Sequence, residues 1–228
     1  MHRRDMERVA VECVIALERC GVTIEVVNDI ERVRSFIFDL DGRVGAAIDP
    51  EQLLLTSGNS FWALAMRHGR PLAAIGVRVD DLGEDDAQAF LAQSVQVIFG
   101  VKVTSRHSDI FSGKKWGRAA YFGGFTSRAA KGISREGRFI IQTLMAYVHH
   151  CAFMDLKSDV NYCFLRGADG PRGLTYGFMR SDPFVWTTDR SMYPDGNPEW
   201  VMQLHRDQLP SLMTSLDLSI GRRFAEDK

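Results

Sequence analysis

The spacing of apolar residues predicts a helix early in the chain and a strand directly after it. Within residues 6–17 the apolar side chains recur every three or four positions, which places them on one face of a helix. Gly21 follows as a helix-ending signal, and the β-branched run at 22–27 is typical of a strand. Two further apolar runs, 61–66 and 72–79, flank a turn containing Gly and Pro and predict a β-hairpin.

An acidic run follows this hairpin and contains no basic residue: Asp80, Asp81, Glu84, Asp85 and Asp86. We interpret it as a solvated loop whose last carboxylates stabilise the start of a helix over 86–98. The stretch 29–56 is ambiguous, although Asp29 is placed to cap a helix and Asp41-Gly42 is a turn signal.

The second half of the chain alternates between strand and helix patterns. We predict a strand over 119–126, a long helix over 134–156 and a strand over 160–165. Three prolines then indicate an irregular C-terminal extension from about residue 181, with a last short helix over 199–209. No repeat or convincing linker divides the chain, so we expect one mixed α/β domain over 1–228.

Composition and charge narrow the class of protein. The chain has 228 residues, 45% of them hydrophobic and 25% charged, which is typical of a globular protein with a sizeable core. Its formal net charge of -1 argues against a nucleic-acid partner. We see no apolar run near the ~18 residues of a membrane helix, and the first residues lack the apolar block of a signal peptide. We therefore expect a soluble cytoplasmic protein without a membrane partner.

The residues that most often bind metals do not form a recognisable site. The four cysteines occur in apolar surroundings without a C-x-x-C pair, which predicts buried free thiols: Cys13, Cys20, Cys151 and Cys163. His149 and His150 are adjacent on the predicted long helix, so they point about 100° apart and do not share a metal in the usual way. We expect no metal cofactor.

The segment 114–138 carries a local charge of +6, because seven Lys and Arg residues are accompanied only by Glu136. Within it, a strand leads through a basic loop to a helix that begins near Ser134. Such a loop can bind phosphate, since free backbone N–H groups converge at a helix N-terminus and Gly132 lets the backbone approach an anion. An ordinary solvated basic loop is the alternative.

Gly123 and Gly124 lie inside the predicted strand that precedes this loop. Glycine weakens a strand and often marks a bulge or the close approach of a ligand. A strand that opens at such a point can offer unpaired amides to an extended ligand that itself contains amides. Close packing of a helix against the sheet is the alternative explanation.

The order of these elements resembles that of the GCN5-related N-acetyltransferase (GNAT) superfamily. The resemblance covers residues 22–178 and includes the glycine-bearing strand 121–126, the basic loop, the long helix, the strand 161–165 and the late Tyr176-Gly177-Phe178. It implies an α/β (α+β) fold in which helices flank a mixed, mainly antiparallel central sheet.

The resemblance also implies a coenzyme A site. In that superfamily a loop of the pattern Gln/Arg-x-x-Gly-x-Gly/Ala cradles the pyrophosphate, and residues 129–134 align with it. Gly132 matches, whereas Ala129 lacks the first polar side chain and Ser134 replaces the small final residue. The cofactor-binding residues implied for the pantetheine arm and the pyrophosphate are Gly123, Gly124, Phe125, Thr126, Lys131, Gly132, Ile133, Ser134 and Arg135.

A catalytic residue is implied in the same way. Many relatives carry a late tyrosine that protonates the departing CoA thiolate, and Tyr176 lies in the corresponding region. It directly precedes Gly177, whereas the usual tyrosine is several residues earlier. A purely structural aromatic role is the alternative for Tyr176.

Three functions are compatible with these patterns. The first is an acyl-CoA-dependent N-acyltransferase that uses acetyl-CoA or another acyl-CoA as co-substrate and a small-molecule or peptide amine as acceptor. The second is a non-catalytic GNAT-like module that binds an acyl-CoA or another anion as a sensor. The third is an unrelated α/β ligand-binding protein. The resemblance favours the first, and the sequence leaves the acceptor and a homodimer open.

Overall fold

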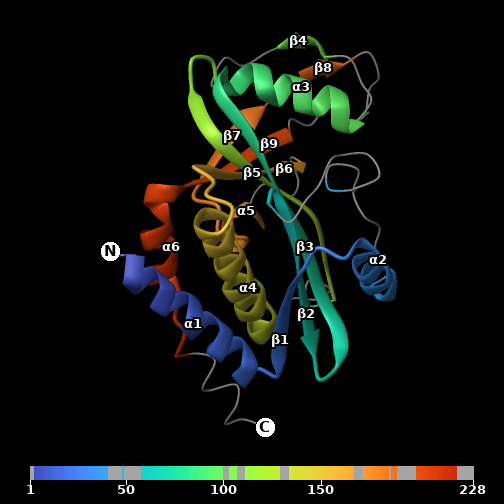
Figure 1. Cartoon of the computed structure of the whole chain (residues 1–228), viewed down its shortest axis with the longest axis vertical. Coiled ribbons are helices and arrows are strands. Elements are labelled where there is room, and N and C mark those ends of the chain that lie inside the picture. Colours follow the sequence, from blue (N-terminus) through green and yellow to red (C-terminus); the bar gives the residue numbers. More distant parts are fainter. Residues whose placement is uncertain are drawn as a thin grey trace.

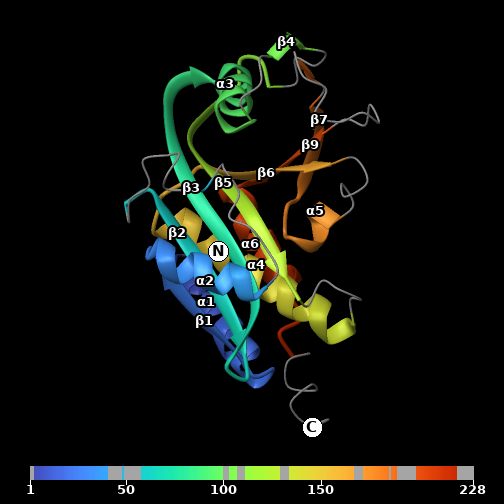
Figure 2. The ribbon, with the colours of Figure 1, turned by 90° about the vertical axis from the view of Figure 1, so that its right-hand side faces the viewer.

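The computed structural model describes residues 3–40, 48, 58–99, 103–106, 111–128, 134–166, 172–184, 186–188 and 199–219. Its centre is a seven-stranded sheet with the strand order β1-β2-β3-β5-β6-β9-β7 (Figure 1, Figure 2). Only β5 and β6 pair in parallel; the other neighbours in this sheet are antiparallel. The strands are β1 (Val22–Val27), β2 (Ser60–Arg67), β3 (Arg70–Asp86), β5 (Lys115–Ser127), β6 (Val160–Arg166), β7 (Arg180–Phe184) and β9 (Glu199–His205). A small second sheet pairs β4 (Val103–Arg106) with β8 (Trp186–Thr188).

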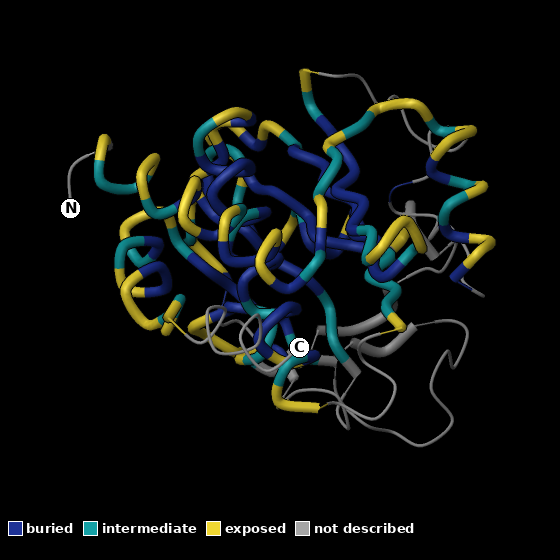
Figure 3. Tube along the Cα trace, turned by 90° about the horizontal axis from the view of Figure 1, so that it is seen from below, coloured by how far each residue is buried: buried dark blue, intermediate teal, exposed yellow. Residues whose placement is uncertain are grey.

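Helices cover both faces of the sheet. The apolar sides of α1 (Arg3–Arg19), α4 (Arg135–Met154) and α6 (Leu209–Ser215) form one core with the face of the sheet that carries Phe122. α2 (Ile30–Asp39) and α3 (Ala87–Phe99) contribute to a second core on the face that carries Trp62. Buried segments accordingly run through the middle of the molecule, between more exposed helices (Figure 3). The expected mixed, mainly antiparallel sheet flanked by helices is confirmed.

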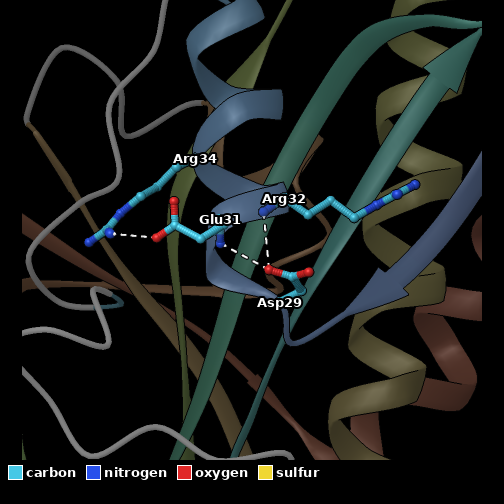
Figure 4. A network of polar contacts seen from close by, with 4 residues as sticks. All are labelled: Asp29, Glu31, Arg32 and Arg34. Atoms are coloured by element: carbon cyan, nitrogen blue, oxygen red, sulfur yellow. Dashed lines mark hydrogen bonds and ion pairs between the residues drawn. The ribbon is translucent and has the colours of Figure 1, made fainter.

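Local sequence signals predicted several elements well. The strand expected at 22–27 is β1, the hairpin is β2 with β3, and the long helix is α4. Asp29 caps α2, because its Oδ1 accepts hydrogen bonds from the backbone N–H groups of Glu31 at 3.0 Å and Arg32 at 3.2 Å (Figure 4). One turn further along, the Glu31 carboxylate pairs with Arg34 at 3.1 Å. These signals lie within a few residues of the element they specify.

The acidic run at 80–86 is not the predicted loop. β3 continues through it to Asp86, since its partner is the basic beginning of β5: Asp81 pairs with Arg118, and Asp86 with Lys115. Opposite charges on paired strands stabilise such a ladder. The prediction that a carboxylate at the end of this run stabilises the start of the next helix is confirmed. Asp86 Oδ1 accepts a hydrogen bond from the backbone N–H of Gln88 at 2.8 Å, at the start of α3.

The prediction for the C-terminal part is also partly wrong. The helix expected at 199–209 is strand β9 as far as His205, and α6 begins only at Leu209. β9 lies between β6 and β7, and its residues Val201 to Leu204 are buried on both faces of the sheet. A short run that is mostly apolar does not distinguish a buried strand from a helix. The extension expected to be irregular from about 181 therefore contributes two strands to the central sheet.

The predicted burial of the cysteines is confirmed, and all four thiols are free. Burial raises the pKa of Cys13 and Cys151 to about 12, which keeps these thiols protonated and unreactive. Among the described residues, no three His, Cys, Asp or Glu side chains are grouped so that they could hold a metal ion. The helices in the described part of the chain are too short or too polar to cross a membrane.

Candidate functional site

The site begins where β5 and β6 separate. These parallel strands pair through three residue pairs, the last of which joins Tyr121 to Tyr162. Both strands continue beyond that pair, β5 to Ser127 and β6 to Arg166, without further pairing to each other. Beyond this last pair, the backbone groups of β5 and β6 that face the gap therefore make no ladder hydrogen bonds from one of these two strands to the other.

A bulge in β5 bends the strand at this point. Gly76 of β3 pairs with Gly123, and Ala74 pairs with Thr126, so three steps along β5 match two along β3. The extra residue is accommodated at Gly124, whose φ of 62° is a conformation that favours glycine. A Cβ on Gly124 would also lie 2.5 Å from Ile48 Cδ1. The predicted glycine signal thus marks a real bulge.

A cavity of about 200 Å³ occupies the gap between the separating strands. Its walls are mostly apolar and come from β5, β6, α4 and the turn after α5 (Arg172–Thr175): Gly123, Gly124, Phe125, Met145, Cys163, Phe164, Leu165, Tyr176 and Phe178. Four predicted site residues, Gly123, Gly124, Phe125 and Tyr176, are therefore brought together around one cavity. Thr126 is paired to β3 and does not line it.

A second cavity, of about 350 Å³, lies beside the first two turns of α4. Arg135 and Arg138 line it, together with residues in and directly after α5 and α6, and both arginines are exposed. The acid between them, Glu136, pairs with Arg67 of β2 at 2.5 Å. Since Glu136 is paired with Arg67, the charged side chains that line this cavity are Arg135, Arg138 and one carboxylate, Asp217, which leaves an excess of positive charge at a helix N-terminus, where the helix dipole also favours anions.

The two cavities are neighbours along α4. Arg138 and Gln142 line the second cavity, and Met145, three residues on, lines the first, so all three share one face of the helix. Tyr176 lines the first cavity, and the residues on either side of it line the second. The site therefore extends from a cationic end at the start of α4 to an apolar end in the sheet.

Residues 129–133 of the predicted phosphate loop lie outside the described residues, and among them are the predicted binding residues Lys131, Gly132 and Ile133. Ser134 is the N-cap of α4, and its Oγ accepts from the N–H of Gly137 at 3.0 Å. Arg135 lines the second cavity. Arg128, before the loop, donates instead to the carbonyl of Asp39 at the end of α2.

Tyr176 follows α5 and is partly buried, with its ring centroid 5.1 Å from that of Phe125. Its carbonyl oxygen is 3.0 Å from Nε2 of His149, which lies in α4. Burial lowers the pKa of His149 to about 4, so the imidazole is neutral at physiological pH. Sequence analysis did not assign His149 a role, although it lies one turn after the cavity residue Met145 on α4.

A polar cluster lies where the strands separate. The guanidinium of Arg78 donates to Asp80 through Nε at 3.0 Å and Nη2 at 2.8 Å, and it lies 5.6 Å from the centre of the Tyr121 ring. Tyr121 in turn contacts Tyr162 and Phe164, with ring centroids 5.4 and 6.2 Å away. Burial raises the pKa of Asp80, and the nearby Arg78 opposes this shift. This cluster offers a cation, a carboxylate and aromatic faces.

Comparison with known proteins finds similar structures among those that have been solved. No protein family matches the sequence, and no curated protein resembles it closely enough to count as a match. Among solved structures, a Drosophila melanogaster polyamine N-acetyltransferase is 14% identical with a TM-score of 0.45; the match covers 81% of this chain and 99% of that one. Arabidopsis thaliana NAA60 in complex with acetyl-CoA is 12% identical with a TM-score of 0.46, covering 82% and 99%. FeeM, an N-acyl amino acid synthase from uncultured soil microbes, is 13% identical with a TM-score of 0.46, covering 84% and 93%.

The sequence identities of these three structures to the chain are 12 to 14%, and their TM-scores are below 0.5. At these identities the likeness concerns the arrangement of helices and strands. It does not assign a substrate or a catalytic residue to this chain.

Proposed function

We propose that this protein is an acyl-CoA-dependent N-acyltransferase that transfers an acyl group, with acetyl-CoA as the first donor to test, to an amine. The observation that carries the proposal is the pair of neighbouring cavities. One is apolar and lies between two parallel strands that separate, and the other is bordered by Arg135 and Arg138 at the start of α4. Coenzyme A has the matching polarity, with anionic phosphates at one end and an amide-containing arm that leads to the thioester.

In this proposal the phosphates lie at the N-terminus of α4, against Arg135, Arg138 and the backbone of loop residues 131–134. A helix N-terminus binds such groups through its free N–H groups and its dipole. The pantetheine arm runs along the open edge of β5 from Thr126 to Gly123 and pairs with its main chain, as an added strand would. The thioester then lies near the last pair of β5 and β6, beside Tyr121.

The chemistry is a direct transfer. A neutral amine nitrogen attacks the thioester carbonyl, a C–N bond forms, and a strand N–H stabilises the negative charge that develops on the carbonyl oxygen. The C–S bond then breaks, and the Tyr176 hydroxyl gives its proton to the departing thiolate. The amine nitrogen loses its extra proton to water, and water returns a proton to the Tyr176 phenolate. In this proposal the cluster of Arg78, Asp80 and Tyr121 forms part of the site that binds the amine acceptor.

The direct test is thiol release by the full-length chain. We expect acetyl-CoA with a panel of primary amines, including polyamines, aminoglycosides, amino acids and peptides, to release free CoA with at least one acceptor. Acetylated product should be found by mass spectrometry in the same reactions. Absence of acetyl-CoA binding in calorimetry would contradict the proposal at its first step.

A second candidate is a non-catalytic acyl-CoA-binding module. The loop sequence favours it, because Ala129 stands where the superfamily pattern has Gln or Arg, and Tyr176 directly precedes Gly177. Binding of acetyl-CoA without thiol release across the whole amine panel would support this candidate over the enzyme.

A further inference from the structure

His149 is fully buried in the middle of α4, and both of its ring nitrogens are engaged. Nε2 lies 3.0 Å from the carbonyl oxygen of Tyr176, and Nδ1 lies 3.0 Å from the side-chain nitrogen of Asn161. Its ring stacks on Phe122 at 4.4 Å between centroids and meets the edge of Phe178 at 4.8 Å. The imidazole thus joins β6 to the turn that carries Tyr176.

The Tyr176 carbonyl fixes which atom donates in each of the hydrogen bonds that lead to it through Asn161 and His149. A carbonyl oxygen only accepts, so Nε2 of His149 carries the hydrogen. The ring is neutral, so Nδ1 accepts from Nδ2 of Asn161, and the Asn161 oxygen faces the other way. That oxygen accepts from Oγ of Ser158 at 2.7 Å, and the same hydroxyl also lies 3.1 Å from the carbonyl oxygen of Ala152. From Asn161 onward the bonds run in one direction, through His149 to the carbonyl of Tyr176.

The turn packs closely against this imidazole. Gly177 has a φ of 82°, and a Cβ on it would lie 3.2 Å from Cδ2 of His149. Phe178, the next residue, contacts the same ring and donates its backbone N–H to the carbonyl of Gly173. His149 therefore supports the turn on one side, while the Tyr176 ring packs on Phe125 in the cavity wall.

We propose that His149 is a positioning residue, which holds the Tyr176 turn through the Tyr176 carbonyl and so fixes the tyrosine ring at the cavity. The catalytic consequence rests on the proposed function, whereas the hydrogen-bonded arrangement does not. A buried, one-directional chain of hydrogen bonds is rigid because each member has one orientation that satisfies both neighbours. The hydrogen bonds thus connect Asn161, in the part of β6 that pairs with β5, to Tyr176 in the wall of the first cavity.

Two substitutions separate the two halves of the contact. In His149→Gln the amide nitrogen occupies the place of Nε2 and still donates to Tyr176, whereas in His149→Asn the amide reaches only Asn161. Both variants lose the aromatic stacking on Phe122, so that loss is common to the two and they differ in the contact with Tyr176 and in side-chain length. We expect kcat for acetyl transfer to stay within about 3-fold of wild type in His149→Gln and to fall at least about 10-fold in His149→Asn. Equal values in the two variants would overturn the proposal.

A spectroscopic measurement tests the arrangement without any activity. Nitrogen NMR of the full chain at pH 7 should show His149 with its hydrogen on Nε2, and a Tyr176–Phe125 ring contact should persist in His149→Gln and disappear in His149→Asn. A hydrogen on Nδ1, or a ring contact that survives in both variants, refutes the inference. If the wild type shows these signals but transfers no acyl group, the proposed function fails and the positioning role stands.

A second variant tests the contact from the other side if His149→Asn does not fold. Gly177→Ala adds a methyl group 3.2 Å from both the His149 ring and Leu212, at a φ of 82° that alanine rarely adopts, and leaves the imidazole in place. We expect it to displace the turn and to weaken the Tyr176–Phe125 ring contact. An unchanged ring contact in a folded Gly177→Ala variant would also contradict the proposal.

Discussion

At the scale of single residues, the protonation of His149 makes the stability of the folded protein depend on pH. Its pKa is about 4 in the folded protein, against 6.5 for an exposed histidine, because burial disfavours the imidazolium. As the pH falls from 6.5 toward 4, the unfolded chain binds a proton that the folded chain does not. The free energy of unfolding therefore falls in this window, by up to about 3 kcal/mol from this group.

Denaturant unfolding of the wild type and His149→Gln at pH 7 and pH 4.5 measures that contribution. His150 and His205, whose pKa values burial also lowers, are present in both proteins and cancel. We expect the wild type to lose more stability between the two pH values than the variant does. An equal loss would show that His149 does not exclude the proton.

Tyr176 makes the second prediction at this scale. Replacing it with Phe removes only the hydroxyl and keeps the ring against Phe125. If this hydroxyl protonates the thiolate, Tyr176→Phe lowers kcat by about 100-fold or more and leaves acetyl-CoA affinity nearly unchanged. Steady-state thiol release with an accepted amine checks it, and a wild-type kcat would remove Tyr176 from the mechanism.

The sequence predicted where Tyr176 lies in the chain, but not how it is held. Its support comes from His149, 27 residues earlier, and from Asn161 on a strand. Helical spacing relates His149 only to residues within a turn or two of α4. A contact between a helix and a distant turn has no local pattern that would reveal it.

At the scale of elements, the bulge in β5 should depend on glycine. Gly124→Ala forces an alanine into a φ of 62° and brings its Cβ to 2.5 Å from Ile48 and 3.1 Å from Trp62. Gly83→Ala is a matched control, because Gly83 has a φ of 51° but no neighbouring atom within 4 Å. We expect both to be destabilised by about 1 kcal/mol of backbone strain, and Gly124→Ala by at least about 1 kcal/mol more.

Thermal or denaturant unfolding of the two variants compares these costs. Equal destabilisation would mean that the space around Gly124 opens without cost and that packing does not fix the bulge. A larger loss in Gly124→Ala, with weaker acetyl-CoA binding in the folded fraction, agrees with a bulge that shapes the cavity.

Elements whose signals are local were predicted, and those that depend on distant partners were not. The hairpin and the Asp29 cap follow from neighbouring residues. The acidic end of β3 becomes a strand only because it pairs with the basic start of β5, about 30 residues later. β9 is a strand because two neighbours pair with it, which its apolar run alone does not specify.

At the scale of the whole molecule, the site depends on how separate segments come together. The glycine pair and the basic segment identified β5 and the start of α4 from the sequence. The cavities themselves also need β6, the turn after α5, and α6, whose positions only the folded sheet defines. A net charge of -1 does not reveal the two arginines in the first turn of α4, because acidic residues elsewhere in the chain balance them.

The central claim is that the cationic cavity and the gap between β5 and β6 together hold an acyl-CoA. Calorimetric titration of the full chain with acetyl-CoA tests it, using a variant that combines Arg135→Glu with Arg138→Glu. Both side chains are exposed, so the variant should fold, and Arg4→Glu on α1 is the control for a change of charge outside both cavities. We predict one binding site in the wild type and in the control, and affinity at least about 10-fold weaker (~1.4 kcal/mol) in the double variant. Equal affinity in all three proteins, or no binding to the wild type, would contradict the account.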